Sequence, residues 1–127
     1  MNLYHFAPKP LKTVIPQLPQ HNYTPGYNFK ISYWYTVPRN LERHPLSGIY
    51  KHHAVVSLNT IYDSKKNPLG LGFSHNNEVG ASLNFLKKSG YHGALFHMGG
   101  YSMVVMFYPV PVRFCPNYKQ KPFRPYK

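Results

Sequence analysis

The distribution of proline constrains this sequence more than any other feature. Ten of the 13 prolines fall within residues 1–27 and 109–127, and only three fall between those segments. Proline lacks an amide donor and fixes φ, so a proline-rich segment favours extended or polyproline-like backbone over a hydrogen-bonded ladder. The sequence therefore predicts an extended N-terminal arm over residues 1–27, a folded core over residues 28–108 and an extended C-terminal arm over residues 109–127.

Both predicted arms carry aromatic and basic side chains among their prolines. An aromatic ring buries a large area at a small cost in side-chain entropy, so extended segments that carry rings are suited to lie along a partner. We expect the arms to contact another molecule, with packing against the chain's own core as the alternative. The rings are Tyr4, Phe6, Tyr23, Tyr27, Phe114, Tyr118, Phe123 and Tyr126.

Alternation of side chains predicts two strands early in the core. In residues 28–37 aromatic or aliphatic side chains occupy every second position, which is the period of a half-buried strand. A loop through Pro45 follows, and a second strand is predicted over residues 52–62. A polar turn at residues 63–68 ends that strand.

Residues 77–88 carry the clearest helix signal. Asn76 is a suitable N-cap, and Glu78 complements the positive end of the helix dipole. Gly90 suits the left-handed conformation that commonly follows a helix. One apolar stripe is formed by Val79, Leu83 and Leu86.

Residues 89–112 contain no Lys, Arg, Asp or Glu. This uncharged segment is long enough that a membrane span over residues 93–110 must be considered. The glycines, histidine, serine and prolines within it favour a hairpin instead, with strands at 94–98 and 101–108 joined at Gly99 and Gly100. The second strand is apolar on both faces, so we expect the helix to cover one face and a partner the other. The predicted fold is α+β, with a β-β-α-β-β core in which one helix packs on a mainly antiparallel sheet.

The charge balance points to an anionic partner. The formal net charge is +12, although Lys and Arg together number an ordinary 15, because Asp and Glu number only three. Cations without acidic partners inside the chain are satisfied by nucleic acid, anionic lipid or acidic patches of other subunits. The predicted binding residues are Lys9, Lys12, Arg39, Arg43, Arg113, Tyr118, Lys119, Lys121, Phe123, Arg124, Tyr126 and Lys127.

Eight histidines suggest one catalytic alternative, the acid–base cleavage of RNA by two imidazoles and a lysine. Adjacent histidines on a strand point to opposite faces, which argues against joint action of His52 and His53. Cys115 is the only cysteine, so no disulfide or multi-cysteine metal site is expected, and a thiol nucleophile paired with His53 is disfavoured by the proline that follows it. The candidates for a nuclease are Lys51, His52, His53, His92 and His97.

The sequence as a whole predicts a non-catalytic structural subunit of a large assembly, such as an organellar ribosome or a respiratory-chain complex. We expect no cofactor and no metal. The alternatives are a small RNA-binding protein or ribonuclease and a membrane-associated subunit. One cysteine and no secretory signal favour an intracellular, reducing compartment, with the mitochondrion as one option.

Overall fold

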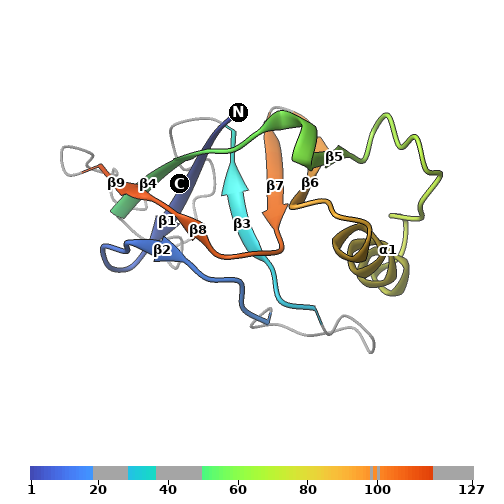
Figure 1. Ribbon diagram of the computed structural model, residues 1–127, viewed down its shortest axis with the longest axis horizontal. Helices are drawn as coiled ribbons and strands as arrows, with labels where there is room; N and C mark the ends of the chain where they lie inside the picture. Colours follow the sequence, from blue (N-terminus) through green and yellow to red (C-terminus); the bar gives the residue numbers. More distant parts are fainter. Residues whose placement is uncertain (19–28, 37–49, 98, 100, 116–127) are drawn as a thin grey trace, which may run out of the picture.

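The structure is a computed structural model that describes residues 1–18, 29–36, 50–97, 99 and 101–115. One α-helix, one 3₁₀ helix and nine strands occupy these residues (Figure 1). The fold is therefore mixed α+β, as predicted. In chain order the elements are β1 (Asn2–Ala7), β2 (Thr13–Val14), β3 (Ser32–Tyr35), β4 (Tyr50–Val55), η2 (Leu58–Thr60), β5 (Ile61–Asp63), α1 (Asn76–Lys88), β6 (Gly93–His97), β7 (Ser102–Met106), β8 (Val110–Pro111) and β9 (Arg113–Phe114).

Seven strands form one sheet in the order β5-β6-β7-β3-β1-β4-β9, and β2 pairs with β8 in a separate two-stranded ribbon. Within the sheet only β5 and β6 run parallel, and the other neighbours are antiparallel. This confirms the prediction of one helix with a mainly antiparallel sheet.

The beginning of the chain differs from the expected arm. β1 lies inside the sheet between β3 and β4, with Leu3 fully buried. The first proline is Pro8, which restricts its own backbone and favours extended backbone at Ala7, so residues 2–7 can form a strand that pairs along both edges. The C-terminal segment also enters the fold, since β8 pairs with β2 and β9 pairs with β4. Residues 19–27 and 116–127 of the predicted arms lie outside the described residues.

The strand predicted over residues 52–62 is two strands. β4 ends at Val55 and β5 begins at Ile61, at nearly opposite ends of the sheet. Between them Ser57 starts a tight turn. Its carbonyl oxygen accepts two hydrogen bonds from Thr60, one from the amide at 3.1 Å and one from the side-chain hydroxyl at 2.7 Å. The connection crosses in front of the central strands in Figure 1.

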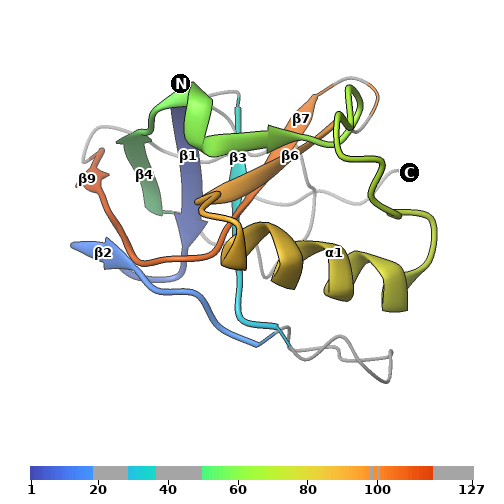
Figure 2. The ribbon, with the colours of Figure 1, turned by 45° about the vertical axis from the view of Figure 1, so that its right-hand side comes forward.

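Two hydrophobic clusters lie on opposite faces of the sheet. On the inner face Leu3, Trp34 and Val104 pack with Val14 and Val110 of the β2–β8 ribbon. On the other face α1 covers the β5-β6-β7 part of the sheet, with its buried leucines packed against strand residues such as Val105. Figure 2 separates the two layers, with α1 beside β6 and β7, and β2 beside β1 and β4.

These two layers explain why strand β7 carries apolar side chains on both faces. Val104 and Val105 are consecutive residues of this strand, and both are buried. Val104 belongs to the inner-face cluster and Val105 to the cluster beneath α1. The expectation that a partner covers the second face of this strand is wrong, because the chain's own β2–β8 ribbon does so. The ribbon pairs β8, which follows β7 closely in sequence, with β2 from the beginning of the chain, and the pattern of β7 alone did not predict that long-range pairing.

Local signals located α1 and the β6–β7 hairpin well. The helix begins one residue earlier than predicted, and His75 rather than Asn76 is its N-cap, with the carboxylate of Glu78 accepting from the amide of His75 at 3.2 Å. Gly90 adopts φ +97°, as its position after the helix predicts. β6 and β7 pair antiparallel on either side of Gly99. In the described part of the chain no helix is long and apolar enough to cross a membrane.

Candidate functional site

The structure divides the nuclease candidates between two distant strands, with Lys51, His52 and His53 on β4, His97 on β6 and His92 just before β6. His52 and His53 lie on opposite faces of β4, as the strand period predicts, and His52 is fully buried. His97 is on β6, and β1, β3 and β7 lie between it and β4. Four inter-strand spacings of about 4.8 Å place these two strands about 19 Å apart. An acid and a base at that separation cannot act on one phosphodiester.

His52 has a structural role instead. Its Nε2 accepts a hydrogen bond from the amide of Leu11 at 2.8 Å, so Nδ1 carries the proton and donates to the carbonyl oxygen of His5 at 3.3 Å. Burial lowers the pKa of His52 and outweighs the hydrogen bonds that raise it. The neutral ring therefore joins β4 and β1 to the turn that leads into β2.

His5 reinforces this buried junction. Its Nδ1 donates to the carbonyl oxygen of Tyr33 at 2.7 Å, and its ring lies 5.2 Å from that of Trp34. Burial lowers the pKa of His5, and proximity to His52 lowers it further, although the bond to Tyr33 opposes both. The two imidazoles are thus held in the neutral form inside the sheet.

A second polar cluster was missed in the sequence. Asp63 Oδ1 lies 3.3 Å from His97 Nε2, and His97 Nδ1 lies 3.4 Å from Ser102 Oγ. The same carboxylate oxygen accepts from the amides of Lys65 at 2.9 Å and Lys66 at 3.3 Å. The order acid, imidazole, hydroxyl is that of a hydrolase triad, but both contacts to the imidazole are longer than most hydrogen bonds of this type.

The pKa of Asp63 is lowered, because the two amides and His97 outweigh burial, which acts to raise it. The carboxylate is therefore ionised and engaged by the turn that follows β5. We interpret the Asp63–His97–Ser102 cluster as a tether between this turn and the β6–β7 hairpin. It is detectable only after β5 is placed beside β6.

A surface of different composition lies on the other half of the sheet. We call the outer face the side chains of β3, β1, β4 and β9 that point away from the Trp34 cluster. Residues directly opposite each other on paired strands share a face, so Tyr35, Tyr4, His53 and Arg113 form one row across the four strands. Tyr33, Phe6 and Lys51 form the adjacent row on the same face.

Ring contacts connect these rows. The Tyr4 and His53 rings are stacked with their centroids 5.2 Å apart, and Lys51 Nζ lies 5.2 Å from the Tyr4 centroid. His53 is also held by Asn2, whose Oδ1 lies 2.9 Å from His53 Nε2. Tyr33 is 39% exposed. The outer face therefore presents tyrosine and histidine rings interleaved with basic groups.

No family model, curated protein or solved structure matches the chain. The function must therefore be inferred from the chain's own side chains. Among the described residues no three His, Cys, Asp or Glu side chains gather closely enough to hold a metal ion. Cys115 extends the β4–β9 pairing through its amide, which donates to the carbonyl oxygen of Lys51 at 3.0 Å.

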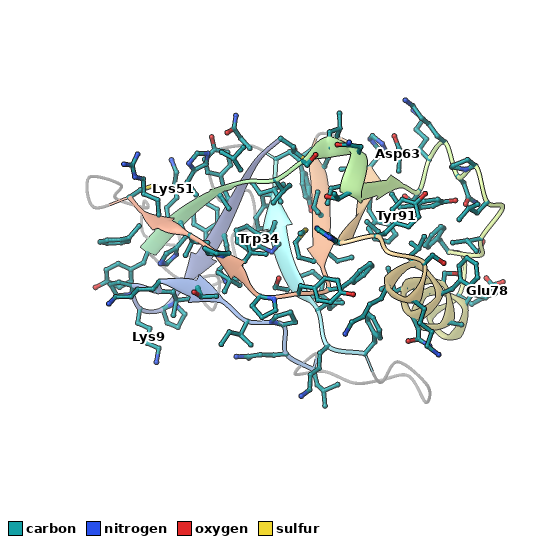
Figure 3. The ribbon with its side chains drawn as sticks, viewed as in Figure 1. Lys9, Trp34, Lys51, Asp63, Glu78 and Tyr91 are labelled. Atoms are coloured by element: carbon teal, nitrogen blue, oxygen red, sulfur yellow. The ribbon has the colours of Figure 1, made fainter. Side chains whose placement is uncertain are left out.

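Acidic groups are segregated from the outer face. Asp63 and Glu78 are the two carboxylates within the described ranges, and Figure 3 shows both toward the β5 and α1 end, opposite Lys9 and Lys51. Within those ranges, His97 and Asp63 are the one basic and acidic side-chain pair whose nitrogen and oxygen atoms lie within 4.0 Å of each other, at 3.3 Å. Of the predicted binding residues, Lys9 and Lys12 are exposed near β2 and Arg113 is exposed on the outer face. The others lie outside the described residues: Arg39, Arg43, Tyr118, Lys119, Lys121, Phe123, Arg124, Tyr126 and Lys127.

Proposed function

We propose that the protein is a non-catalytic, cationic binding subunit that associates with an anionic partner in a larger assembly. One observation carries this proposal: both described carboxylates are already engaged by donors of the chain itself. Asp63 accepts from two turn amides and contacts His97, and Glu78 accepts from the amide of His75. The positive charge of the exposed Lys9, Lys12 and Arg113 is therefore left for a partner to neutralise.

The arrangement of the histidines supports a binding role over a catalytic one. His52 is buried and hydrogen-bonded on both nitrogens, and His53 is stacked on Tyr4. His92 packs edge-on against Tyr108, and His97 contacts Asp63. Each of these imidazoles has a partner that accounts for its position without a substrate.

An organellar ribosome and a respiratory-chain complex are the two assemblies that suit a small, acid-depleted subunit. Both offer extensive anionic surface, in the form of RNA or of acidic patches on neighbouring chains. A mitochondrial location is consistent with either and is part of the proposal. Lys9 and Lys12, which are exposed near β2, would add to the charged contact on this account.

The proposal is tested by sizing the protein in a gentle extract of its source at moderate salt. We expect it in a particle much larger than its own 14.7 kDa, and we expect stronger salt to release it, since contacts between exposed charges are screened. Nuclease treatment of the same fractions separates a particle held by RNA from one made of protein. Elution as a free monomer at moderate salt would contradict the proposal.

A further inference from the structure

We infer that the outer face is a binding site for single-stranded nucleic acid, in which an unpaired base stacks on Tyr33 and Arg113 pairs with the phosphate backbone. This inference rests on the proposed cationic binding function and names the class of its partner and the surface used. Base stacking on exposed aromatic rings combined with nearby cations is the recognition mode of proteins that bind single strands.

Tyr33 is the platform with the most accessible ring. It lies in β3, its ring makes no ring–ring contact with any described residue, and its hydroxyl makes no hydrogen bond within the described part of the chain. Its backbone carbonyl is fixed by the 2.7 Å bond from His5, so the strand beneath the ring is rigidly held. An exposed tyrosine on a rigid strand is ready to stack without a further loss of backbone freedom.

Arg113 supplies the phosphate contact. It is exposed at the sheet edge in β9, and its guanidinium has no hydrogen bond or ion pair with any described residue. Register places it in one row with His53 and Tyr4, whose stacked rings lie between β9 and β3. A strand of nucleic acid that crosses this row meets a cation at one end and rings along its length.

The remaining side chains of the outer face form the floor of this site. Phe6, Tyr35 and Lys51 hold interactions within the chain, so they support the exposed groups rather than contact the ligand first. Lys51 adds positive charge next to the Tyr4 ring, and no described carboxylate lies on these four strands. The local potential therefore favours a polyanion.

The chemistry of the face favours nucleic acid over other anionic partners. An acidic peptide needs only lysines to pair with its carboxylates, so it does not account for a row of aromatic rings. A bilayer surface would favour several exposed aliphatic side chains, whereas Val55 is the one large exposed aliphatic residue on the described outer face. A single strand is favoured over a duplex, because only unpaired bases expose their flat faces for stacking.

The test measures fluorescence anisotropy of a labelled single-stranded RNA with the full chain, over a series of salt concentrations. A DNA strand of the same sequence, the RNA duplex and polyglutamate as competitor are compared in parallel. We expect both single strands to bind more tightly than the duplex, and polyglutamate to compete weakly. Tyr33→Leu should raise the Kd for single strands about tenfold, whereas Tyr33→Phe should leave it within about twofold.

Arg113→Gln should weaken binding and reduce the slope of log K against log salt by about 0.7, the value for one phosphate contact on a single strand. Its matched control is Lys66→Gln, which removes one exposed charge in the turn after β5, at the opposite edge of the sheet. That site is more than a Debye length of about 8 Å from β9, so binding should stay within about twofold of the wild type.

Three results would overturn the inference. Absence of binding to either single strand at low salt is the first. Equal affinity of wild type, Tyr33→Leu and Tyr33→Phe, with full competition by polyglutamate, would show recognition by charge alone, and the proposed cationic function would then stand without this site. The third is an equal loss of affinity in Lys66→Gln and Arg113→Gln, which would show that the nucleic acid does not contact the positive charge of the outer face specifically. The proposed function itself fails by a different result, a free monomer in the native extract.

Discussion

Replacing His52 with Phe removes two partly buried hydrogen bonds while nearly preserving the volume of the ring. The amide of Leu11 loses its acceptor at 2.8 Å, and the carbonyl oxygen of His5 loses its donor at 3.3 Å. Leaving one buried backbone group without a partner costs about 1–3 kcal/mol, and the longer second bond adds little. We expect the free energy of unfolding to fall by about 2 kcal/mol, which corresponds to a decrease in Tm of about 8 °C for a chain of this size.

The assay is urea unfolding followed by far-ultraviolet circular dichroism, with thermal unfolding as a second measurement. His53→Phe is the matched control, since it changes the same residue type at the next position on the opposite face. That variant keeps a ring against Tyr4 and loses only the exposed contact to Asn2, so its cost should stay below about 1 kcal/mol. An equal cost for the two variants would refute the assignment of His52 as the buried junction.

The pH dependence gives a further readout of the same variant. Burial lowers the folded-state pKa of both His52 and His5, so below about pH 6.5 the unfolded chain binds more protons than the folded chain. The contribution of these two histidines to stability should therefore be fully present above about pH 6.5 and should be lost as the pH falls through their lowered folded-state pKa values. His52→Phe should show a shallower decline, and identical slopes in variant and wild type would contradict the reasoning.

Three further predictions follow from the packing and the turns. Gly93→Ala should destabilise by about 1–3 kcal/mol in urea unfolding, because the added Cβ would lie 2.7 Å from a sulfur atom and against a strand carbonyl; a neutral result would contradict that close approach. Leu83→Ala should cost about 2–5 kcal/mol, whereas Phe85→Ala on the same helix, half exposed, should cost far less. Asp63→Asn should reduce the loss of stability below about pH 4. The pKa of the Asp63 carboxyl is lowered in the folded state, so its contribution to the free energy of unfolding is present above the unfolded-state pKa and is lost in acid. An unchanged acid profile would contradict this prediction.

The elements that the sequence predicted well are those set by neighbours in the chain. α1 and the β6–β7 hairpin depend on spacing, capping and glycine positions within residues 76–106. The prolines at positions 8–25 predict an extended arm for residues 1–27 as a whole, but residues 2–7 contain no proline and form β1. The break between β4 and β5 was missed because the hydrophobic pattern continues through the turn at Ser57.

The candidate site depends on register, which is a property of pairs of distant strands. Tyr4 and Arg113 were recognised as aromatic and basic residues of the two ends, and Arg113 was a predicted binding residue. Only the pairing of β1 with β4, and of β4 with β9, places them in one row. Conversely, the histidines suggested only an alternative catalytic function, and the strand order separates those of β4 from His97 on β6. The composition shows the depletion of acidic residues, but it does not predict that Asp63 and Glu78 lie away from the outer face.

We propose that this chain binds single-stranded nucleic acid through the outer face of its sheet. Ultraviolet cross-linking of the native particle, followed by mass spectrometry of the cross-linked peptides, tests it most directly. We expect nucleotide adducts on the peptide that contains Tyr33, and a loss of those adducts in Tyr33→Leu particles. Nucleotide adducts confined to α1, or particles that yield none, would contradict it.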